Sequence, residues 1–211
     1  MPSTPAVAPP VVVVLTGGAS SRMGAHKPLL EVDGRPLVAR VLDAAGDRPT
    51  LVVGPGQGVP EGVRVVREPV PGGGPVSGLA TALATLLDDA RAADGPPSGT
   101  RFPYAVVLLA ADLPFVTPDH VERLVAALAS ADLAVTVDPA DRVNWLCAAW
   151  RTDALGRRLE ALGDPYGRSM RDLADGVPRV PVTDHDRVAL DVDTPADLER
   201  ARRRAAGDPD A

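Results

Sequence analysis

The segment Leu15-Thr-Gly-Gly-Ala-Ser-Ser-Arg-Met-Gly-Ala-His-Lys27 directly follows the aliphatic run Val11 to Val14. This order predicts a buried strand that leads into a phosphate-binding loop. Glycines let backbone N–H groups approach a ligand closely, because they lack a Cβ and adopt positive φ angles at little cost. Arg22 and Lys27 add positive charge to the loop.

The loop matches neither of two common nucleotide-binding patterns. A P-loop requires Lys-Ser or Lys-Thr directly after its last glycine, whereas Gly24 is followed by Ala25. The dinucleotide pattern Gly-x-Gly-x-x-Gly also fails, because Gly17 and Gly18 are adjacent and Gly24 lies six positions further on. The loop is therefore either a third kind of phosphate site or an ordinary glycine turn with exposed cations.

Length and composition indicate a single α/β domain. The chain has 211 residues, 45% of them hydrophobic, which is ample for one core. We expect this domain over residues 11–206, with a disordered tail at 1–10 and a short tail at 207–211. The lone Cys147 lies in an apolar stretch and is expected to be a small core residue.

Charge and hydropathy argue against nucleic acid and membranes as binding partners of the protein. A net charge of −6 argues against a nucleic-acid-binding surface, which relies on clustered Lys and Arg side chains. We expect no membrane span, because no apolar run approaches the roughly 20 residues that a helix needs to cross a bilayer. The N-terminal residues lack the features of a secretory signal, so we expect a cytoplasmic protein.

Aliphatic runs alternate with segments of helical spacing, which predicts a doubly wound, mostly parallel sheet of the Rossmann-like kind. The predicted strands are Val11–Leu15, Leu51–Val53, Val63–Val66, Ala105–Ala110, Leu133–Val137 and Leu146–Trp150. The predicted helices are Pro36–Ala45, Ser77–Ala93, Pro118–Ala129, Thr152–Leu162 and Ser169–Ala174, with a final helix after Thr194-Pro195. His120, in the first turn of one helix, and His185 are expected to be exposed.

Two acidic segments are candidates for a ligand site, and the first follows the predicted strand Ala105–Ala110, at the edge of the sheet where ligands gather. Asp112, before Pro114, either holds Mg²⁺, which prefers oxygen ligands, or forms a turn. Asp191 and Asp193 are two positions apart, so in an extended segment both point to the same side. They either face a metal together or help to start the helix after Thr194.

In order and content, these motifs resemble the sugar-nucleotide and molybdenum-cofactor nucleotidyltransferases. That family opens with Leu-Ala-Gly-Gly-x-Ser-x-Arg-Met-Gly-x-Asp-Lys, which residues 15–27 match at nearly every position. Asp112-Leu-Pro-Phe115, Gly74-Pro75 with Gly78, and Asp191-x-Asp-Thr-Pro195 resemble its later motifs. Within the family, the chain is most similar to the molybdenum cofactor guanylyltransferases, which join GMP from GTP to molybdopterin and release pyrophosphate.

The resemblance implies a set of functional residues and a Mg²⁺ cofactor. It gives catalytic roles to Arg22, Lys27 and Asp112 and metal binding to Asp112 and Asp193. The nucleotide contacts that it implies are Leu15, Thr16, Gly17, Gly18, Lys27, Gly54, Glu68, Gly74, Pro75, Gly78 and Asp112. Glu68 either accepts hydrogen bonds from guanine N1–H and its amino group or is a solvated surface residue.

The chain departs from the family pattern at three places. His26 stands for an acidic residue, Asp193 for an asparagine, and Asn144-Trp145 for His-Pro. Because Asp-x-Asp-Thr-Pro is also similar to related cytidylyltransferases, CTP stays open as the donor and another phosphorylated molecule as the acceptor. A non-catalytic nucleotide-binding partner is the alternative of a different class. Molybdoenzymes or their chaperones are the protein partners that the resemblance admits.

Overall fold

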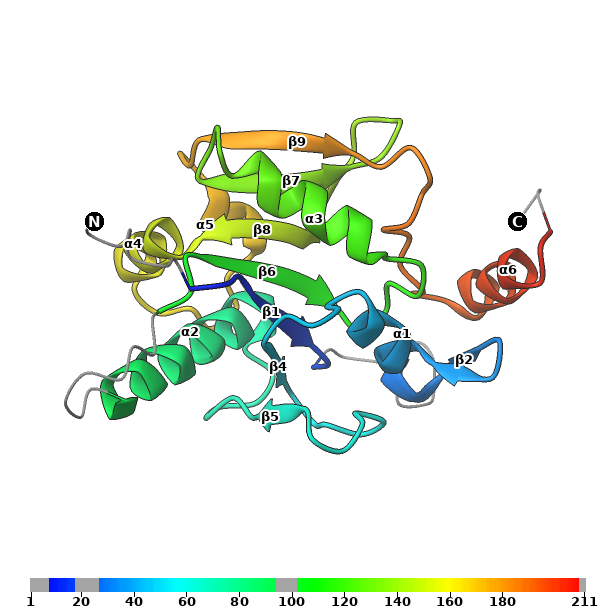
Figure 1. Ribbon diagram of the computed structural model, residues 1–211, viewed down its shortest axis with the longest axis horizontal. Coiled ribbons are helices and arrows are strands. Elements are labelled where there is room, and N and C mark those ends of the chain that lie inside the picture. The colour runs from blue at the N-terminus through cyan, green and yellow to red at the C-terminus, as the bar shows by residue number, and fades with distance from the viewer. Residues whose placement is uncertain (1–7, 18–26, 94–101, 209–211) are drawn as a thin grey trace, which may run out of the picture.

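The computed structural model describes residues 8–17, 27–93 and 102–208, and its framework is one mixed sheet (Figure 1). The seven strands follow the order β5-β4-β1-β6-β8-β7-β9. Their bounds are β1 Val11–Leu15, β4 Thr50–Val53, β5 Arg64–Val66, β6 Ala105–Ala110, β7 Leu133–Val137, β8 Val143–Arg151 and β9 Arg179–Thr183. All neighbouring pairs are parallel except the two that involve β8. The predicted doubly wound, mostly parallel α/β fold is thus confirmed.

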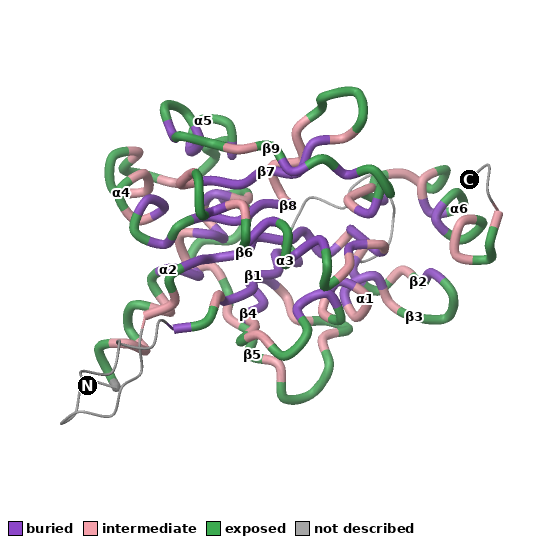
Figure 2. The backbone as a smooth tube through the Cα atoms, turned by 45° about the horizontal axis from the view of Figure 1, so that its top comes forward, coloured by how far each residue is buried: buried purple, intermediate pink, exposed green. Residues whose placement is uncertain are grey.

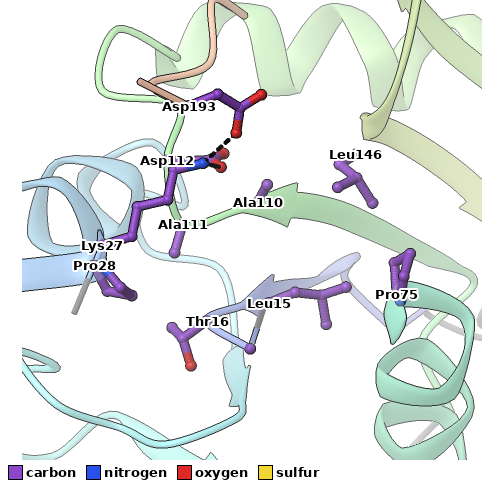
Figure 3. A pocket seen from close by; sticks show the side chains of 11 residues that line it. Leu15, Thr16, Lys27, Pro28, Pro75, Ala110, Ala111, Asp112, Leu146 and Asp193 are labelled. Atoms are coloured by element: carbon purple, nitrogen blue, oxygen red, sulfur yellow. Dashed lines mark hydrogen bonds and ion pairs between the residues drawn. The ribbon is translucent and has the colours of Figure 1, made fainter. Parts of the chain in front are cut away.

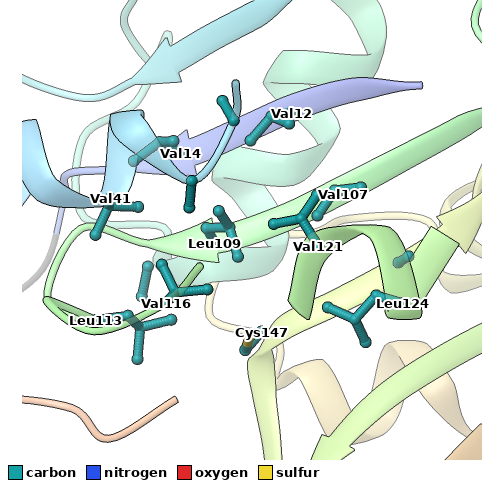
Figure 4. Packing of buried hydrophobic residues seen from close by; sticks show 14 of the residues in the cluster. Val12, Val14, Val41, Val107, Leu109, Leu113, Val116, Val121, Leu124 and Cys147 are labelled. Carbon is teal, nitrogen blue, oxygen red and sulfur yellow. The ribbon is translucent and has the colours of Figure 1, made fainter. Parts of the chain in front are cut away.

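Helices cover both faces of the sheet. Their bounds are α1 Leu37–Asp43, α2 Gly74–Ala93, α3 Pro118–Ala127, α4 Thr152–Leu162, α5 Met170–Ala174 and α6 Pro195–Ala205. Alternate residues of β1 point to opposite faces, so one strand serves two cores. Val12 and Val14 pack with α1 and α3, as Figure 4 shows, whereas Val13 and Leu15 pack with α2 and α4.

The burial pattern in Figure 2 explains why the central strands are continuous aliphatic runs. Every residue of β1 and β6 is buried, as expected of strands covered on both faces. The edge strand β9 differs, since only Val182 is buried and Pro181 interrupts its apolar character. Proline is tolerated at a sheet edge, where its missing N–H is not needed. For this reason the aliphatic pattern of the sequence does not predict β9.

A third, smaller cluster joins the segment around residues 30–37 to the C-terminal helix α6. The hairpin of β2, Glu31–Val32, and β3, Arg35–Pro36, packs beside α6. Its turn residues Asp33 and Gly34 have φ of 54° and 67°, which is the tight turn that their sequence predicts.

The structure extends or corrects several predicted details. β8 begins three residues earlier than expected, and α2 begins at Gly74 rather than Ser77. Ala8, in the predicted tail, is buried and forms a parallel bridge with Pro103. Residues 1–7, 18–26, 94–101 and 209–211 lie outside the described residues. Within the described ranges, no helix has the length and apolar character to cross a bilayer.

The expected exposure of His120 is wrong. Its ring is fully buried, because His120, Val121 and Leu124 share the face of α3 that covers the sheet. The Nε2 atom lies 2.8 Å from Thr136 Oγ1, and Nδ1 lies 2.9 Å from an Arg123 nitrogen. Burial lowers the pKa of His120 below its ordinary value. His120 is therefore a hydrogen-bonded core residue.

Candidate active site

The strand order creates a crevice beside β1. The chain leaves β1 for β4 and β5 on one side and returns through β6 on the other. In open α/β sheets, such a reversal opens a ligand site at the carboxyl ends of the strands. A cavity of about 270 Å³ lies at this point. Leu15 to Gly17 and Ala110 to Asp112 line it from these two strand ends, with Pro75 and Leu146 across from them (Figure 3).

Lys27 joins two carboxylates from distant parts of the chain. Its Nζ donates to Asp112 Oδ2 at 2.5 Å and to Asp193 Oδ1 at 2.6 Å, as the dashed lines in Figure 3 mark. Asp112 follows β6, and Asp193 precedes α6. The side chains of Lys27 and Asp112 are 16% and 21% exposed, whereas that of Asp193 is 56% exposed. The structure thus brings together three of the residues predicted from sequence.

The local charges shift the pKa values of these groups. Burial is the largest influence on the Lys27 pKa and lowers it, but the charge of Asp112 and the two hydrogen bonds outweigh burial and raise it overall. Burial raises the pKa of Asp112 despite the ammonium beside it. The hydrogen bond from Lys27 holds the pKa of Asp193 below its usual range. Burial and the charges of Asp193 and Asp112 raise the pKa of Asp191.

The donor set fits a hard cation that keeps most of its own waters. Asp112 Oδ1 is buried and has no hydrogen-bond partner among the described residues, so one oxygen is available for a further ligand. The described residues contain no cluster of three or more His, Cys, Asp or Glu side chains that would enclose a metal. Mg²⁺ commonly binds through one or two carboxylates together with substrate phosphates. Asp112 and Asp193 are suited to that mode.

Gly54 lies against Thr16 and Gly17, at the start of the predicted phosphate-binding loop, rather than lining the cavity. Its φ is 129°, and a Cβ there would lie 2.5 Å from Thr16 Oγ1 and 2.8 Å from the Gly17 nitrogen. Thr16 itself is buried, and its Oγ1 donates to Val53 O at 3.3 Å. The close approach of these backbones needs a glycine and sets where the loop leaves β1.

Of the other predicted nucleotide contacts, some line the cavity and others lie near it. Pro75 lines the cavity, whereas Gly74 and Gly78 do not, and a Cβ on Gly78 would lie 3.1 Å from Leu15 Cδ2. Glu68 Oε2 lies 3.6 Å from the point that a Cβ added to Gly17 would occupy. Glu68 Oε1 is buried without a hydrogen-bond partner among the described residues. Glu68 therefore faces the loop rather than bulk solvent.

Gly18, Arg22 and His26 lie outside the described residues, so their predicted roles stay predictions.

A second cavity, of about 640 Å³, adjoins the first along Leu146. Asn144, Trp145, Asp184 and Asp191 are among the residues that line it. The guanidinium of Arg179 lies 5.8 Å from the centre of the Trp145 ring. The sequence marks Asn144-Trp145 as a departure from the family pattern, but it indicates a role at the site for neither Asn144 nor Asp184.

A mostly parallel sheet carries a cavity at its strand reversal, with paired carboxylates at the same edge. This arrangement is compatible with a nucleotidyltransferase, the class that the comparisons with known proteins assign. Residues 12–180 match the MobA-like NTP transferase domain. The chain belongs to this family.

Named relatives and solved structures agree with that assignment. The chain is 34% identical over 194 residues to a probable molybdenum cofactor guanylyltransferase of Mycobacterium marinum, covering 88% of this chain and 90% of the relative. It is 32% identical to the molybdenum cofactor guanylyltransferase of Rhodobacter capsulatus, covering 91% and 94% of the two chains.

The fold is similar to two crystal structures at lower identity. One is molybdopterin-guanine dinucleotide biosynthesis protein A from Archaeoglobus fulgidus, with a TM-score of 0.69, 21% identity, and coverage of 93% of this chain and 99% of the other. The second is 2-C-methyl-D-erythritol 4-phosphate cytidylyltransferase from Thermus thermophilus, with a TM-score of 0.62, 22% identity, and coverage of 92% and 98%.

Proposed function

We propose that the chain transfers GMP from GTP to molybdopterin and releases pyrophosphate. The observation that carries the proposal is the meeting of Lys27, Asp112 and Asp193 in one crevice, although Lys27 is 85 and 166 residues away from the two carboxylates. Family membership supports nucleotidyl transfer, and the names of the relatives support guanylyl transfer to this acceptor.

The reaction is an in-line displacement at the α-phosphorus of GTP. An oxygen of the acceptor's terminal phosphate forms the new bond to this phosphorus, while the bond to the oxygen that bridges to the β-phosphate breaks. That bridging oxygen leaves on pyrophosphate with the electron pair. The acceptor phosphate is already ionised at neutral pH, so no enzyme base is needed. The chain mainly positions the reactants and neutralises charge.

Cations on the chain serve the leaving group. Lys27 can exchange a carboxylate partner for an oxygen of the departing pyrophosphate, because its ammonium is a compact donor on a flexible stem. Arg22 is proposed for the same task. Asp112 and Asp193 would hold Mg²⁺, which supplies charge neutralisation at the phosphate oxygens. The fit of the Asp112 oxygen that lacks a partner supports this assignment.

Glu68 favours guanine over cytosine as the base. Its carboxylate offers only acceptors, and guanine presents N1–H and an amino group side by side as donors. Cytosine presents an amino group beside the acceptor N3, which a carboxylate repels. Because Glu68 Oε1 is buried without a partner among the described residues, two donors from the base would satisfy it. A base that lacks these two donors leaves the buried carboxylate oxygen unpaired, and this penalty discriminates strongly between substrates.

The proposal is tested by pyrophosphate release from each of the four nucleoside triphosphates, with Mg²⁺ and molybdopterin present, followed by mass analysis of the dinucleotide. We expect turnover with GTP and at least a 100-fold loss in Asp112→Ala, which removes charge stabilisation. Asp119→Ala, an exposed carboxylate on α3, is the control and should keep normal turnover.

Three results would overturn parts of this proposal. Strict use of CTP would refute the choice of donor, and near-normal turnover of Asp112→Ala would refute the role of Asp112. Tight GTP binding without pyrophosphate release would favour a non-catalytic nucleotide-binding partner. We further propose that molybdoenzymes or their chaperones receive the product, because a guanine dinucleotide cofactor has to be delivered to the enzymes that use it.

A further inference from the structure

Residues 187–193, which we call the carboxylate strap, run from the turn after β9 to the start of α6 and carry Asp191 and Asp193 (Figure 1). At its downstream end, Val192 N donates to Asp112 O at 3.1 Å, and Asp193 Oδ1 accepts from Lys27. The strap thus delivers one carboxylate directly to the proposed site. What fixes its upstream end decides where that carboxylate lies.

Asp184 fixes the turn that starts the strap. It is only 3% exposed, and both of its oxygens accept backbone hydrogen bonds. Oδ1 accepts from Val188 N and Oδ2 from Ala189 N, each at 2.8 Å. Its own N–H donates to Val137 O, at the end of β7, at 2.8 Å. A buried carboxylate whose two oxygens are both used in this way ties the turn to the sheet.

The turn contains a backbone conformation that is unfavourable without support from surrounding contacts. Arg187 has φ of 52°, in the left-handed region that residues other than glycine seldom adopt. Such positions persist when surrounding contacts over-determine them, and they are frequent at functional sites. The two hydrogen bonds to Asp184 enclose Arg187, and Arg204 Nη1 donates to Arg187 O at 2.8 Å, so these contacts together supply that constraint.

Asn144, on β8, is hydrogen-bonded to the same strap. Its Nδ2 donates to Ala189 O at 2.9 Å, while its Oδ1 accepts from Leu146 N at 3.0 Å. The pairing of β7 with β8 shifts register next to Thr136 and Asn144, so the side chain lies at an irregular point of the sheet. With both ends of the amide engaged, its orientation is fixed. The peptide groups on both sides of Ala189 are therefore held, the N–H by Asp184 and the C=O by Asn144.

We propose that Asn144 and Asp184 are positioning residues that set the place of Asp191 and Asp193 in the transfer site. Ala189 lies two residues before Asp191, and the strap is next fixed at Val192. A displacement at Ala189 therefore moves Asp191 directly, and it reaches Asp193 only by straining the Val192 contact. The inference rests on the proposed transfer reaction for its catalytic consequence, but not for the geometry of the strap.

The first test is the isosteric variant Asn144→Asp, which keeps the acceptor for Leu146 and replaces the donor to Ala189 by a second acceptor. We expect kcat for pyrophosphate release to fall about 10- to 100-fold, since a misplacement of about 1 Å costs that much in rate. The KM for GTP should stay within about twofold, because Glu68, the proposed base contact, faces Gly17 rather than the strap. A rise in the GTP KM with unchanged kcat would overturn the proposal.

A double-mutant cycle separates positioning from general damage. If Asn144 acts through the strap, Asn144→Asp should have little further effect in an Asp191→Asn/Asp193→Asn background. An equal loss of kcat in both backgrounds would mean that Asn144 supports the fold in general, and the proposal would fail.

Amide hydrogen exchange tests the strap without any activity. We expect the Ala189 and Val192 amides to exchange at least about 10-fold faster in Asn144→Asp and in Asp184→Asn, because local opening sets exchange rates. Asp138→Asn is the matched control: Asp138 Oδ1 accepts from Ala140 N and Arg142 N in the neighbouring turn, and it should leave Ala189 unchanged.

The outcomes distinguish the two proposals. Unchanged exchange of the Ala189 amide in both Asn144→Asp and Asp184→Asn refutes the positioning role, even if the wild type transfers GMP. Faster exchange at Ala189 combined with a wild type that releases no pyrophosphate would refute the proposed function and leave the strap geometry standing. If Asn144→Asp does not fold, Asn144→Ser, which removes the contact without adding charge, replaces it in all three measurements.

Discussion

Removal of the Lys27 ammonium provides a quantitative test of the site. In Lys27→Met, the largely buried Asp112 loses its cation, and Asp193 loses the hydrogen bond that holds its pKa down. Breaking a fully buried ion pair costs about 3–5 kcal/mol, because a charge is left uncompensated. Here Asp193 is 56% exposed and solvent screens part of the effect, so we expect about 2–3 kcal/mol near pH 8.

The loss should depend on pH with a definite sign. Without Lys27, the pKa of Asp112, already raised by burial, rises further, so the folded variant holds a proton that the unfolded chain releases above an ordinary value of 3.8. Stability of the variant therefore falls as pH rises from that value through the raised pKa. The stabilisation from the lowered pKa of Asp193, normally present above 3.8, is also lost. Near pH 5 the destabilisation should be clearly smaller than near pH 8.

Urea unfolding of wild type and Lys27→Met at both pH values measures these differences. The expected loss near pH 8 corresponds to roughly 4–12 °C in melting temperature for a chain of this size. Lys27→Met/Asp112→Asn should recover at least about 1 kcal/mol, since a neutral amide needs no cation. Arg91→Met breaks an exposed pair with Asp88 and should lose nothing measurable. Equal losses at both pH values, or no loss at all, would refute the reasoning.

Three further predictions concern groups around the site and in the core. Gly54→Ala should cost about 2–4 kcal/mol in thermal unfolding, since its Cβ would lie 2.5 Å from a side-chain oxygen at a φ of 129°. Gly62→Ala, with a φ of 88° but open space, should lose less, and equal losses would argue against the contact. Burial raises the pKa of Cys147 to about 12, so thiol reagents near pH 8 should label it only after unfolding, and rapid labelling of the folded chain would contradict its core position. Because burial lowers the pKa of His120, the unfolded chain takes up the proton first, and stability should fall as pH drops below about 6.5. Urea midpoints should show this fall flattened in His120→Gln and unchanged in the exposed His185→Gln; identical pH profiles for the two variants would be inconsistent with a buried neutral ring.

The sequence predicts the first half of the fold well, because each buried parallel strand is a continuous aliphatic run that ends in a recognisable loop. It does not predict the direction of β8, since a strand buried on both faces has the same pattern whether it is parallel or antiparallel. β9 escapes prediction because an edge strand containing Pro181 lacks that pattern. The buried face of α3 was available in the spacing of His120, Val121 and Leu124, but the position of His120 in the first turn suggested exposure instead.

The candidate site shows a similar division. The resemblance marks Lys27, Asp112 and Asp193 as functional, and the fold brings them together. What sequence cannot show is that the ammonium lies between the two carboxylates rather than beside the phosphates alone, because this depends on where the chain after β9 returns. Nor can spacing reveal the contact of Asn144 with Ala189, which joins residues 45 positions apart.

The reversed direction of β8 has a consequence for how such an enzyme can change its substrate. Because β8 pairs antiparallel with β6 and β7, its first residues, rather than its last, reach the ligand edge of the sheet. The wall that carries Asn144 and Trp145 therefore adjoins a short hairpin turn at residues 138–142, not a long crossover helix. Insertions in a hairpin turn leave the neighbouring strands in place, so this turn is a natural graft point. Exchanging this turn would change the cavity lined by Asn144 and Trp145. The cavity at the ends of β1 and β6 would keep its geometry.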